Sequence, residues 1–159
     1  MDEPVDIVQL LRDVVADRAP VAYRAGREIE LDAGPVALPF QGNRQALFSA
    51  LANVIDNAIR AEPPGGVVVV RFADDGVVEI VDHGAGVRTE DRAIVFEPFW
   101  RGAASLPGAG LGLAIVKEIA SRHRVDVSVG DTEGGGATFR FIFRQTAHPL
   151  SRPAVANAL

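Results

Sequence analysis

The chain contains no cysteine, which excludes both a disulfide framework and a metal site built on thiolates. It also has no run of basic residues, and its net charge of −5 at pH 7 argues against a surface that binds nucleic acid. No apolar run approaches the roughly 20 residues that span a bilayer, and the N-terminal residues lack the apolar stretch of a signal peptide. We therefore expect these residues to fold in water and not to insert into a membrane.

What is present is sufficient for one domain. The 159 residues are 48% hydrophobic, which allows one core but leaves little room for two. After Gln145 the sequence carries Pro149, Pro153 and several alanines without periodicity. We therefore expect a single domain over residues 1–145 and a flexible tail over residues 146–159.

Helical and strand patterns do not alternate strictly along the chain. Apolar residues recur at helical spacing from Val5 to Ala19, with Asp6 as the cap and Pro20 just beyond the end. Further helices are predicted over Arg44–Arg60 (capped by Asn43), Thr89–Val95 and Leu111–Arg122, and strands over Arg27–Ala33, Val36–Phe40, Val67–Ala73, Val77–Val81, Val125–Gly130 and Thr138–Phe143. This order predicts an α+β fold, a two-layer α/β sandwich whose mixed, mostly antiparallel sheet is covered by helices on one face.

Two asparagines on the second predicted helix are candidate metal ligands. Asn53 and Asn57 stand at positions i and i+4, so both amides project from one helix face. Side-chain carbonyl oxygens suit Mg²⁺, which keeps several waters and takes its remaining oxygens from phosphate. Two solvated asparagines are the alternative interpretation. Arg60, one turn further on, can reach a phosphate, although an exposed arginine is ordinary at a helix end.

An acidic residue and a glycine pair follow the strand that ends at Val81. The Asp82 carboxylate can accept a hydrogen bond from the exocyclic amine of adenine, and Gly84 and Gly86 let the backbone pass close to a flat ring. An ordinary strand-to-loop turn is the alternative, because Asp and Gly are common in such turns. We expect His83, inside this turn, to be exposed and uninvolved.

A second glycine string opens the last predicted helix. Gly108, Gly110 and Gly112 precede free N–H groups at a helix N-terminus, which form an anion site that allows close approach. The string is not the dinucleotide fingerprint, because it does not follow a strand. It is not a Walker A loop either, because no Lys-Ser/Thr follows the last glycine.

Together these motifs resemble the catalytic ATP-binding domain of bacterial sensor histidine kinases, within the GHKL or Bergerat-fold superfamily. The resemblance covers nearly everything from Val5 to Arg144. Four boxes carry it in the family's order and spacing: the N box Asn53–Ala58, the first glycine box Asp82–Gly86, the F box Phe96–Phe99 and the second glycine box Gly108–Leu113.

The resemblance implies a Mg-ATP site with the nucleotide between the helix layer and a flexible lid, roughly Phe96 to Gly110. Asn57 and Asn53 are the implied Mg²⁺ ligands, and no residue acts in catalysis beyond the positioning of ATP and metal by Asn53, Asn57 and Arg60. Trp100 is expected to report closure of the lid. The implied contacts to ATP are Asn53, Asn57, Arg60, Asp82, Gly84, Gly86, Val87, Phe96, Phe99, Arg101, Gly108, Gly110, Leu111, Gly112, Leu113 and Thr138.

Asn53 also decides between branches of the superfamily. The ATP-hydrolysing relatives typically carry a glutamate there as general base, and a neutral amide cannot serve as one. We therefore favour a histidine kinase over an ATP hydrolase. A non-catalytic nucleotide sensor is the other alternative, because Ala61 replaces an aromatic residue that packs near adenine. The chain also departs from the family at Arg60, usually lysine, and at His123-Arg124-Val125, usually His-Gly-Gly.

The family's phosphoacceptor histidine lies in a helical hairpin before this domain, and nothing upstream of Val5 can hold it. We therefore expect an excised, monomeric cytoplasmic domain of a longer sensor anchored in the inner membrane. Its implied partners are the hairpin of its own full-length kinase and a downstream response regulator, with no nucleic acid.

Overall fold

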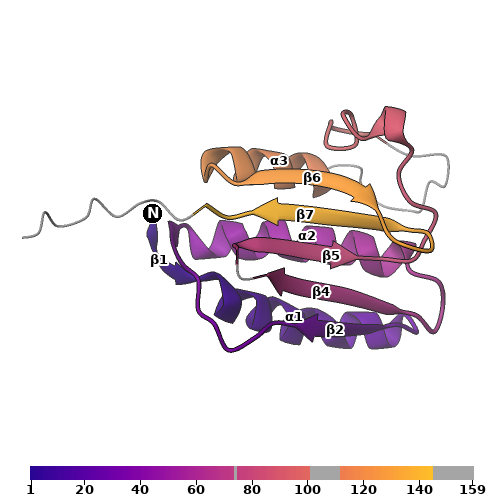
Figure 1. The fold of residues 1–159 in the computed structure, drawn as a ribbon, viewed down its shortest axis with the longest axis horizontal. Coiled ribbons are helices and arrows are strands. Elements are labelled where there is room, and N and C mark those ends of the chain that lie inside the picture. The colour runs from indigo at the N-terminus through magenta and orange to yellow at the C-terminus, as the bar shows by residue number, and fades with distance from the viewer. Residues whose placement is uncertain (74, 101–111, 145–159) are drawn as a thin grey trace, which may run out of the picture.

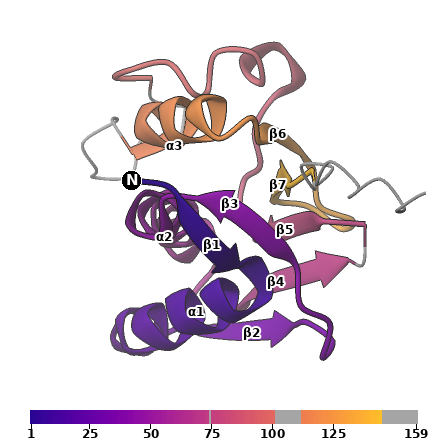
Figure 2. The same ribbon diagram turned by 90° about the vertical axis from the view of Figure 1, so that its left-hand side faces the viewer.

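Two layers make up the part of the chain that this computed structural model describes, residues 1–73, 75–100 and 112–144. Within it, five strands form a sheet in the order β2-β4-β5-β7-β6, and three helices lie on one face of that sheet (Figures 1 and 2). The strands are β2 (Glu28–Asp32), β4 (Val67–Ala73), β5 (Val77–Val81), β6 (Asp126–Asp131) and β7 (Ala137–Ile142), and the helices are α1 (Ile7–Arg24), α2 (Arg44–Ala61) and α3 (Gly112–Arg122).

The sheet is mixed, as predicted. β2 pairs in parallel with β4, and the other three pairings are antiparallel. The tight turn at Gly76 joins β4 to β5, and the glycines before β7 join it to β6. The structure therefore confirms the predicted α+β two-layer sandwich.

The core lies between the helices and the sheet. The apolar stripe predicted on α2 is buried, and it faces side chains that alternate inward along the central strands. Fully buried side chains from both layers include Leu51, Val54, Ile55, Ile80 and Phe139. The open face of the sheet instead carries charged pairs in cross-strand register, such as Glu79 with Arg140 at 2.9 Å. A buried ligand site can therefore form on the face of the sheet that the helices cover.

The first predicted helix begins two residues later than expected. Val5 belongs to a short strand, β1 (Glu3–Asp6), which pairs antiparallel with β3 (Pro39–Gly42) and places Val5 opposite Phe40. Asp6 caps α1 as predicted, because its Oδ1 accepts from the backbone N–H of Val8 at 3.0 Å. The prediction was wrong because the pairing partner lies far away in sequence, where local periodicity carries no signal.

The same helix also continues past the predicted stop at Pro20. A proline inside a helix removes the hydrogen bond to the carbonyl four residues earlier, here that of Ala16. Both residues are exposed, so water can satisfy the free carbonyl. The extra turn buries Ala22 completely, and this packing outweighs the local preference to stop.

The start of α2 is anchored by two side chains. Asn43 caps the helix as predicted, accepting from the N–H of Ala46 at 2.9 Å. Its own N–H donates to Nε2 of His123 at 3.1 Å, and the other ring nitrogen of His123 lies 2.7 Å from the carbonyl of Ile119. The histidine after α3 therefore ties α3 to the beginning of α2.

Two further elements differ from expectation: the strand predicted over Val36–Phe40 forms instead as β3, and the helix predicted over Thr89–Val95 is shorter. Only Thr89–Asp91 of the predicted helix Thr89–Val95 is helical, as the 3₁₀ turn η1. After α3, the chain keeps a left-handed turn although glycine is missing. Arg124 has φ 55°, and the N–H groups of Arg124 and Val125 donate back to the carbonyls of Ser121 and Ala120 at 3.3 and 2.9 Å, the pattern of a Schellman motif.

Arg124→Gly is therefore expected to stabilise the domain. A side chain at positive φ costs about 1–2 kcal/mol, and the extra freedom of glycine in the unfolded chain offsets part of the gain. We expect a net increase of about 0.5–1 kcal/mol in the free energy of unfolding, measured by urea denaturation. Arg124→Ala is the matched control, because it removes the same side chain but keeps the Cβ. An equal effect of both variants would contradict the argument.

Candidate functional site

Asp82 is a buried carboxylate with one oxygen left unpaired. It follows β5 directly and is 1% exposed. Its Oδ1 accepts from the N–H groups of Gly84 and Ala137 at 2.9 and 3.2 Å. No partner for its buried Oδ2 exists among the described residues. A buried polar atom without a partner is rare and suggests a ligand, so this oxygen fits the predicted acceptor for the adenine amine.

Glycines surround Asp82 where the backbones meet. Gly136, at φ 120°, lies so close to the Asp82 carbonyl that a Cβ would overlap it. A Cβ on Gly84 would overlap the carbonyl of Ala61 at the end of α2. Gly86 has φ 75°, and a Cβ added to it would lie 3.1 Å from the carbonyl oxygen of Gly136. The first glycine turn is thus wedged between α2 and the loop before β7, which holds Asp82 in place.

Asn53 and Asn57 lie half-buried on α2, as the predicted helix face requires. The amide nitrogen of Asn53 donates to the carbonyl of Gly112 at 3.5 Å, which leaves its carbonyl oxygen available as an acceptor or ligand. Asp56 points elsewhere, toward α1, where its Oδ1 accepts from Arg18 at 3.2 Å. Arg60 is exposed in the last turn of α2. The structure therefore brings the N box against the start of α3.

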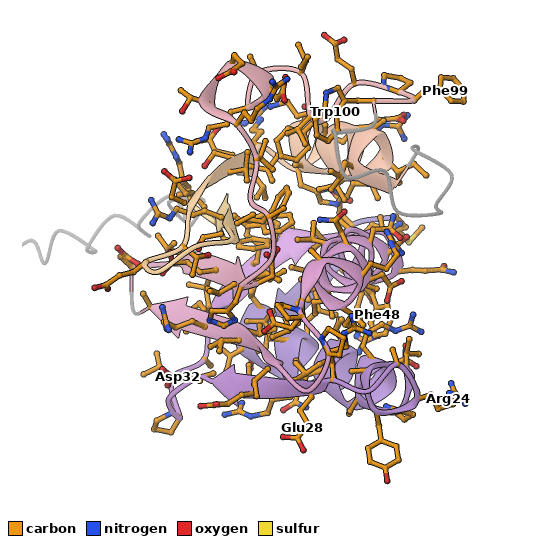
Figure 3. All side chains as sticks on the ribbon, turned by 90° about the vertical axis from the view of Figure 1, so that its right-hand side faces the viewer. Arg24, Glu28, Asp32, Phe48, Phe99 and Trp100 are labelled. Carbon is orange, nitrogen blue, oxygen red and sulfur yellow. The ribbon has the colours of Figure 1, made fainter. Side chains whose placement is uncertain are left out.

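The F box shows two different environments. Phe96 is half-buried and packs edge-to-face on Phe139, with ring centroids 6.0 Å apart. Trp100 also packs against the core. Phe99 is 73% exposed, has φ 63° and projects away from the molecule (Figure 3). Phe96 is therefore the member of the pair that joins the F box to the sheet.

The remaining predicted contacts are divided between described and undescribed parts of the chain. Val87 and Leu113 are half-buried against the core, and Thr138 on β7 is 9% exposed with its hydroxyl 2.9 Å from that of Thr132. Arg101, Gly108, Gly110 and Leu111 lie outside the described residues, as does the predicted tail from residue 146.

A second buried carboxylate was missed by the sequence analysis. Glu62, directly after α2, is 2% exposed. Its Oε2 accepts from the backbone N–H of His83 at 2.8 Å, and its Oε1 lies 2.9 Å from Nδ1 of the same residue. His83 is exposed as predicted, with its side chain 45% accessible, but it also pairs with Glu62, which the sequence analysis did not anticipate. A signal existed, because an acidic residue at a helix C-terminus opposes the helix dipole and needs a partner.

The buried environment of Asp82 changes the pKa of its carboxyl group. Burial raises the pKa of the Asp82 carboxyl above its ordinary value, and the hydrogen bonds from Gly84 and Ala137 oppose that rise. Among nearby charges, the Glu62 carboxylate raises the pKa further and His83 lowers it. The ionised carboxylate is therefore held at a free-energy cost to folding, as is common at sites kept for ligands.

Asp82→Asn is accordingly expected to stabilise the ligand-free domain at neutral pH. A carboxyl whose pKa is higher in the folded state contributes most to stability below its unfolded pKa, and that contribution is lost as the pH rises through the folded-state pKa. The difference in Tm, variant minus parent, should therefore grow from pH 4 to pH 8. Glu62→Gln in both backgrounds controls for the facing carboxylate. A difference that stays constant or shrinks with pH would contradict this account.

The comparisons with known proteins agree with this arrangement. Residues 42–147 match the family described as histidine kinase-, DNA gyrase B-, and HSP90-like ATPase. The signal transduction histidine-protein kinase/phosphatase MprB of Mycolicibacterium smegmatis is 38% identical over 140 residues, which cover 84% of this chain and 28% of that protein. MprB of Mycolicibacterium paratuberculosis is 39% identical, with 84% and 26% covered. The chain thus spans about a quarter of the length of these relatives.

Solved structures show the same fold. The mycobacterial sensor histidine kinase MprB superposes with a TM-score of 0.76 at 33% identity, covering 90% of this chain and 97% of that one. The ATP-binding domain of PrrB from Mycobacterium tuberculosis gives 0.70 at 28% identity, covering 89% and 96%. Full-length ShkA in complex with AMPPNP gives 0.70 at 34% identity, covering 88% and 30%.

The chain therefore belongs to the family of histidine kinase-, DNA gyrase B- and HSP90-like ATPases. Within that family the relatives named above are histidine kinases, and this chain corresponds to their ATP-binding catalytic domain, which supports ATP as its ligand. None of the helices in the described ranges is both long and apolar enough to cross a bilayer.

Proposed function

We propose that this domain binds Mg-ATP and donates the γ-phosphoryl group to a histidine on a helical hairpin supplied by the rest of the same protein. The unpaired Oδ2 of Asp82 is the observation that carries the proposal, because a buried acceptor with no donor among the described residues fits the amine of adenine. The half-buried amides on α2 and the start of α3 provide the phosphate end of the site.

The residues of the site fit a magnesium ion of the kind that ATP brings with it. The described residues contain no group of three or more His, Cys, Asp or Glu that could enclose a metal. Asn57 and Asn53 would hold the ion through their carbonyl oxygens, with phosphate and water completing the shell. When bound, the ion neutralises charge on the phosphates. Arg60 would contact phosphate as a second cation.

The chemistry follows from what the site contains and what it lacks. A neutral histidine nitrogen attacks the γ-phosphorus, the bond to the β–γ bridging oxygen breaks, and ADP leaves with the electron pair while the ring gives a proton to solvent. This nucleophile needs no general base, which agrees with an amide at Asn53. Activation of water would need a carboxylate at that position.

The rest of the assignment follows the same proposal. Residues 1–145 form the catalytic domain, and a response regulator accepts the phosphoryl group from the histidine afterwards. The named relatives are signal transduction kinases several times longer than this chain, and the proposal places the domain on the cytoplasmic side of an inner-membrane sensor.

The experiment follows the γ-phosphate of ATP. The purified domain is incubated with Mg-ATP labelled at the γ-position and with the hairpin of its own full-length kinase, with and without EDTA. We expect label on the hairpin as an acid-labile, base-stable phosphohistidine that depends on Mg²⁺. Release of inorganic phosphate without the hairpin would indicate a hydrolase. Tight ATP binding with no transfer would indicate a sensor.

A further inference from the structure

Glu62 and Asp82 are the two charged residues that the described part of the chain buries almost completely, at 2% and 1% exposure. Glu62 lies at the end of α2 and Asp82 at the end of β5. His83, the residue after Asp82, forms hydrogen bonds with Glu62. A buried carboxylate needs compensating hydrogen bonds to be tolerated. Asp82 receives its bonds from Gly84 in its own turn and from Ala137 on β7, whereas Glu62 receives its bonds from His83 in that same turn.

The Glu62 side chain bridges α2 to the first glycine turn. Its two oxygens take the backbone N–H of His83 at 2.8 Å and the ring Nδ1 at 2.9 Å. Because a carboxylate only accepts, the ring donates from a protonated Nδ1. The next N–H along the turn, that of Gly84, is the one that holds Oδ1 of Asp82. The N–H group that Glu62 holds and the N–H group that orients Asp82 therefore belong to consecutive residues, His83 and Gly84.

The carboxylate is closely packed in this position. Gly66 lies against it so closely that a Cβ there would overlap the Glu62 side chain. The backbone of Glu62 is held as well, because its carbonyl accepts from Nε of Arg27 at 2.9 Å and its N–H donates to the carbonyl of Ala58 at 2.8 Å. The backbone and the carboxylate of Glu62 are thus both held by hydrogen bonds.

We propose that Glu62 is a positioning residue for adenine recognition, which acts through His83 to hold the turn so that Oδ2 of Asp82 faces the base. The inference rests on the proposed function of the site. Glu62 need not touch the nucleotide. Glu62 affects the preference for adenine over guanine. If Asp82 is displaced, its carboxylate loses the hydrogen bond to the adenine amine. The same displacement weakens the repulsion between this carboxylate and the guanine carbonyl oxygen.

Three variants separate positioning from stability. Glu62→Ala removes both bonds and leaves the His83 N–H without its acceptor. Glu62→Gln keeps an acceptor for that N–H and loses the charge. Glu79→Ala is the matched control, because Glu79 lies on β5, is half-buried and pairs with Arg140 on the open face of the sheet.

The measurement is the ratio of ATP to GTP affinity, determined by calorimetry with Mg²⁺ present. We expect Glu62→Ala to lower this ratio about tenfold, as one lost buried hydrogen bond predicts, and Glu62→Gln to restore it to within about threefold of the parent. Glu79→Ala should leave the ratio unchanged. A variant that is only less stable would bind both nucleotides less well without changing their ratio.

His83→Ala provides an independent test if Glu62→Ala fails to fold, because it removes the ring and keeps the backbone N–H. It should lower the ratio by about threefold, since the backbone bond remains. An unchanged ratio in whichever of these two variants folds overturns the inference. A parent protein that binds neither nucleotide overturns the proposed function instead, so the two failures are distinguishable.

Discussion

Asp82→Asn is expected to lower the affinity for ATP ten- to a hundredfold while the fold stays intact. Oδ1 of Asp82 accepts from the N–H groups of Gly84 and Ala137, so Oδ2 is the atom that we expect to meet the base. In the variant, the side-chain N–H₂ that the substitution introduces replaces Oδ2 and would face the N–H₂ of adenine, so two donors meet. A buried pair of donors costs about 1–3 kcal/mol of binding free energy, which corresponds to a ten- to hundredfold loss of affinity.

Calorimetric titration with Mg-ATP measures this effect. Asp126→Asn is the control, because Asp126 is an exposed aspartate on β6 that pairs with Arg144 at 2.8 Å. The variant at position 82 should bind weakly and yet unfold at a higher temperature near neutral pH, for the reason given above. Unchanged ATP binding by a folded Asp82→Asn protein would show that this carboxylate does not read the base.

Asn57→Ala is expected to abolish most of the phosphoryl transfer and to spare the recognition of adenine. The side chain belongs to the half-buried face of α2, which also carries Asn53 next to the start of α3. Removing one group that positions charge in a phosphoryl-transfer site lowers the rate on the order of a hundredfold or more. Asp82 and its turn are untouched, so adenosine should bind as it does to the parent.

Two assays make this separation. Transfer of the γ-phosphate to the hairpin is followed over a range of Mg²⁺ concentrations, and adenosine binding is measured without metal. Gln45→Ala serves as the control, because it removes an exposed amide from the first turn of the same helix. Equal transfer rates for Asn57→Ala and the parent would refute the ligand role.

Most of the fold could be predicted because it rests on local patterns. The apolar stripe of α2, the alternation along β4 and β5, and the caps Asp6 and Asn43 all have their causes within a few residues. The pairing of β1 with β3 could not be predicted this way, because each strand is only four residues long and its partner is distant. The extension of α1 beyond Pro20 likewise depends on a packing gain at Ala22.

The candidate site was predicted from its ordered motifs, and the structure adds how they are supported. Asp82 was selected as a strand-end carboxylate, but its buried carboxylate also accepts from the N–H of Ala137, which follows it by more than fifty residues. Glu62 was overlooked because a glutamate before prolines reads as an ordinary helix end. Its partner, the His83 N–H, becomes visible only when β5 and α2 are placed side by side.

The most direct test of the central claim is a crystal structure of the domain with AMPPNP and Mg²⁺. The account predicts the adenine amine at about 2.9 Å from Oδ2 of Asp82 and the magnesium ion at about 2.1 Å from the side-chain oxygen of Asn57. Adenine bound away from Asp82, or a metal held without either asparagine of α2, would contradict it.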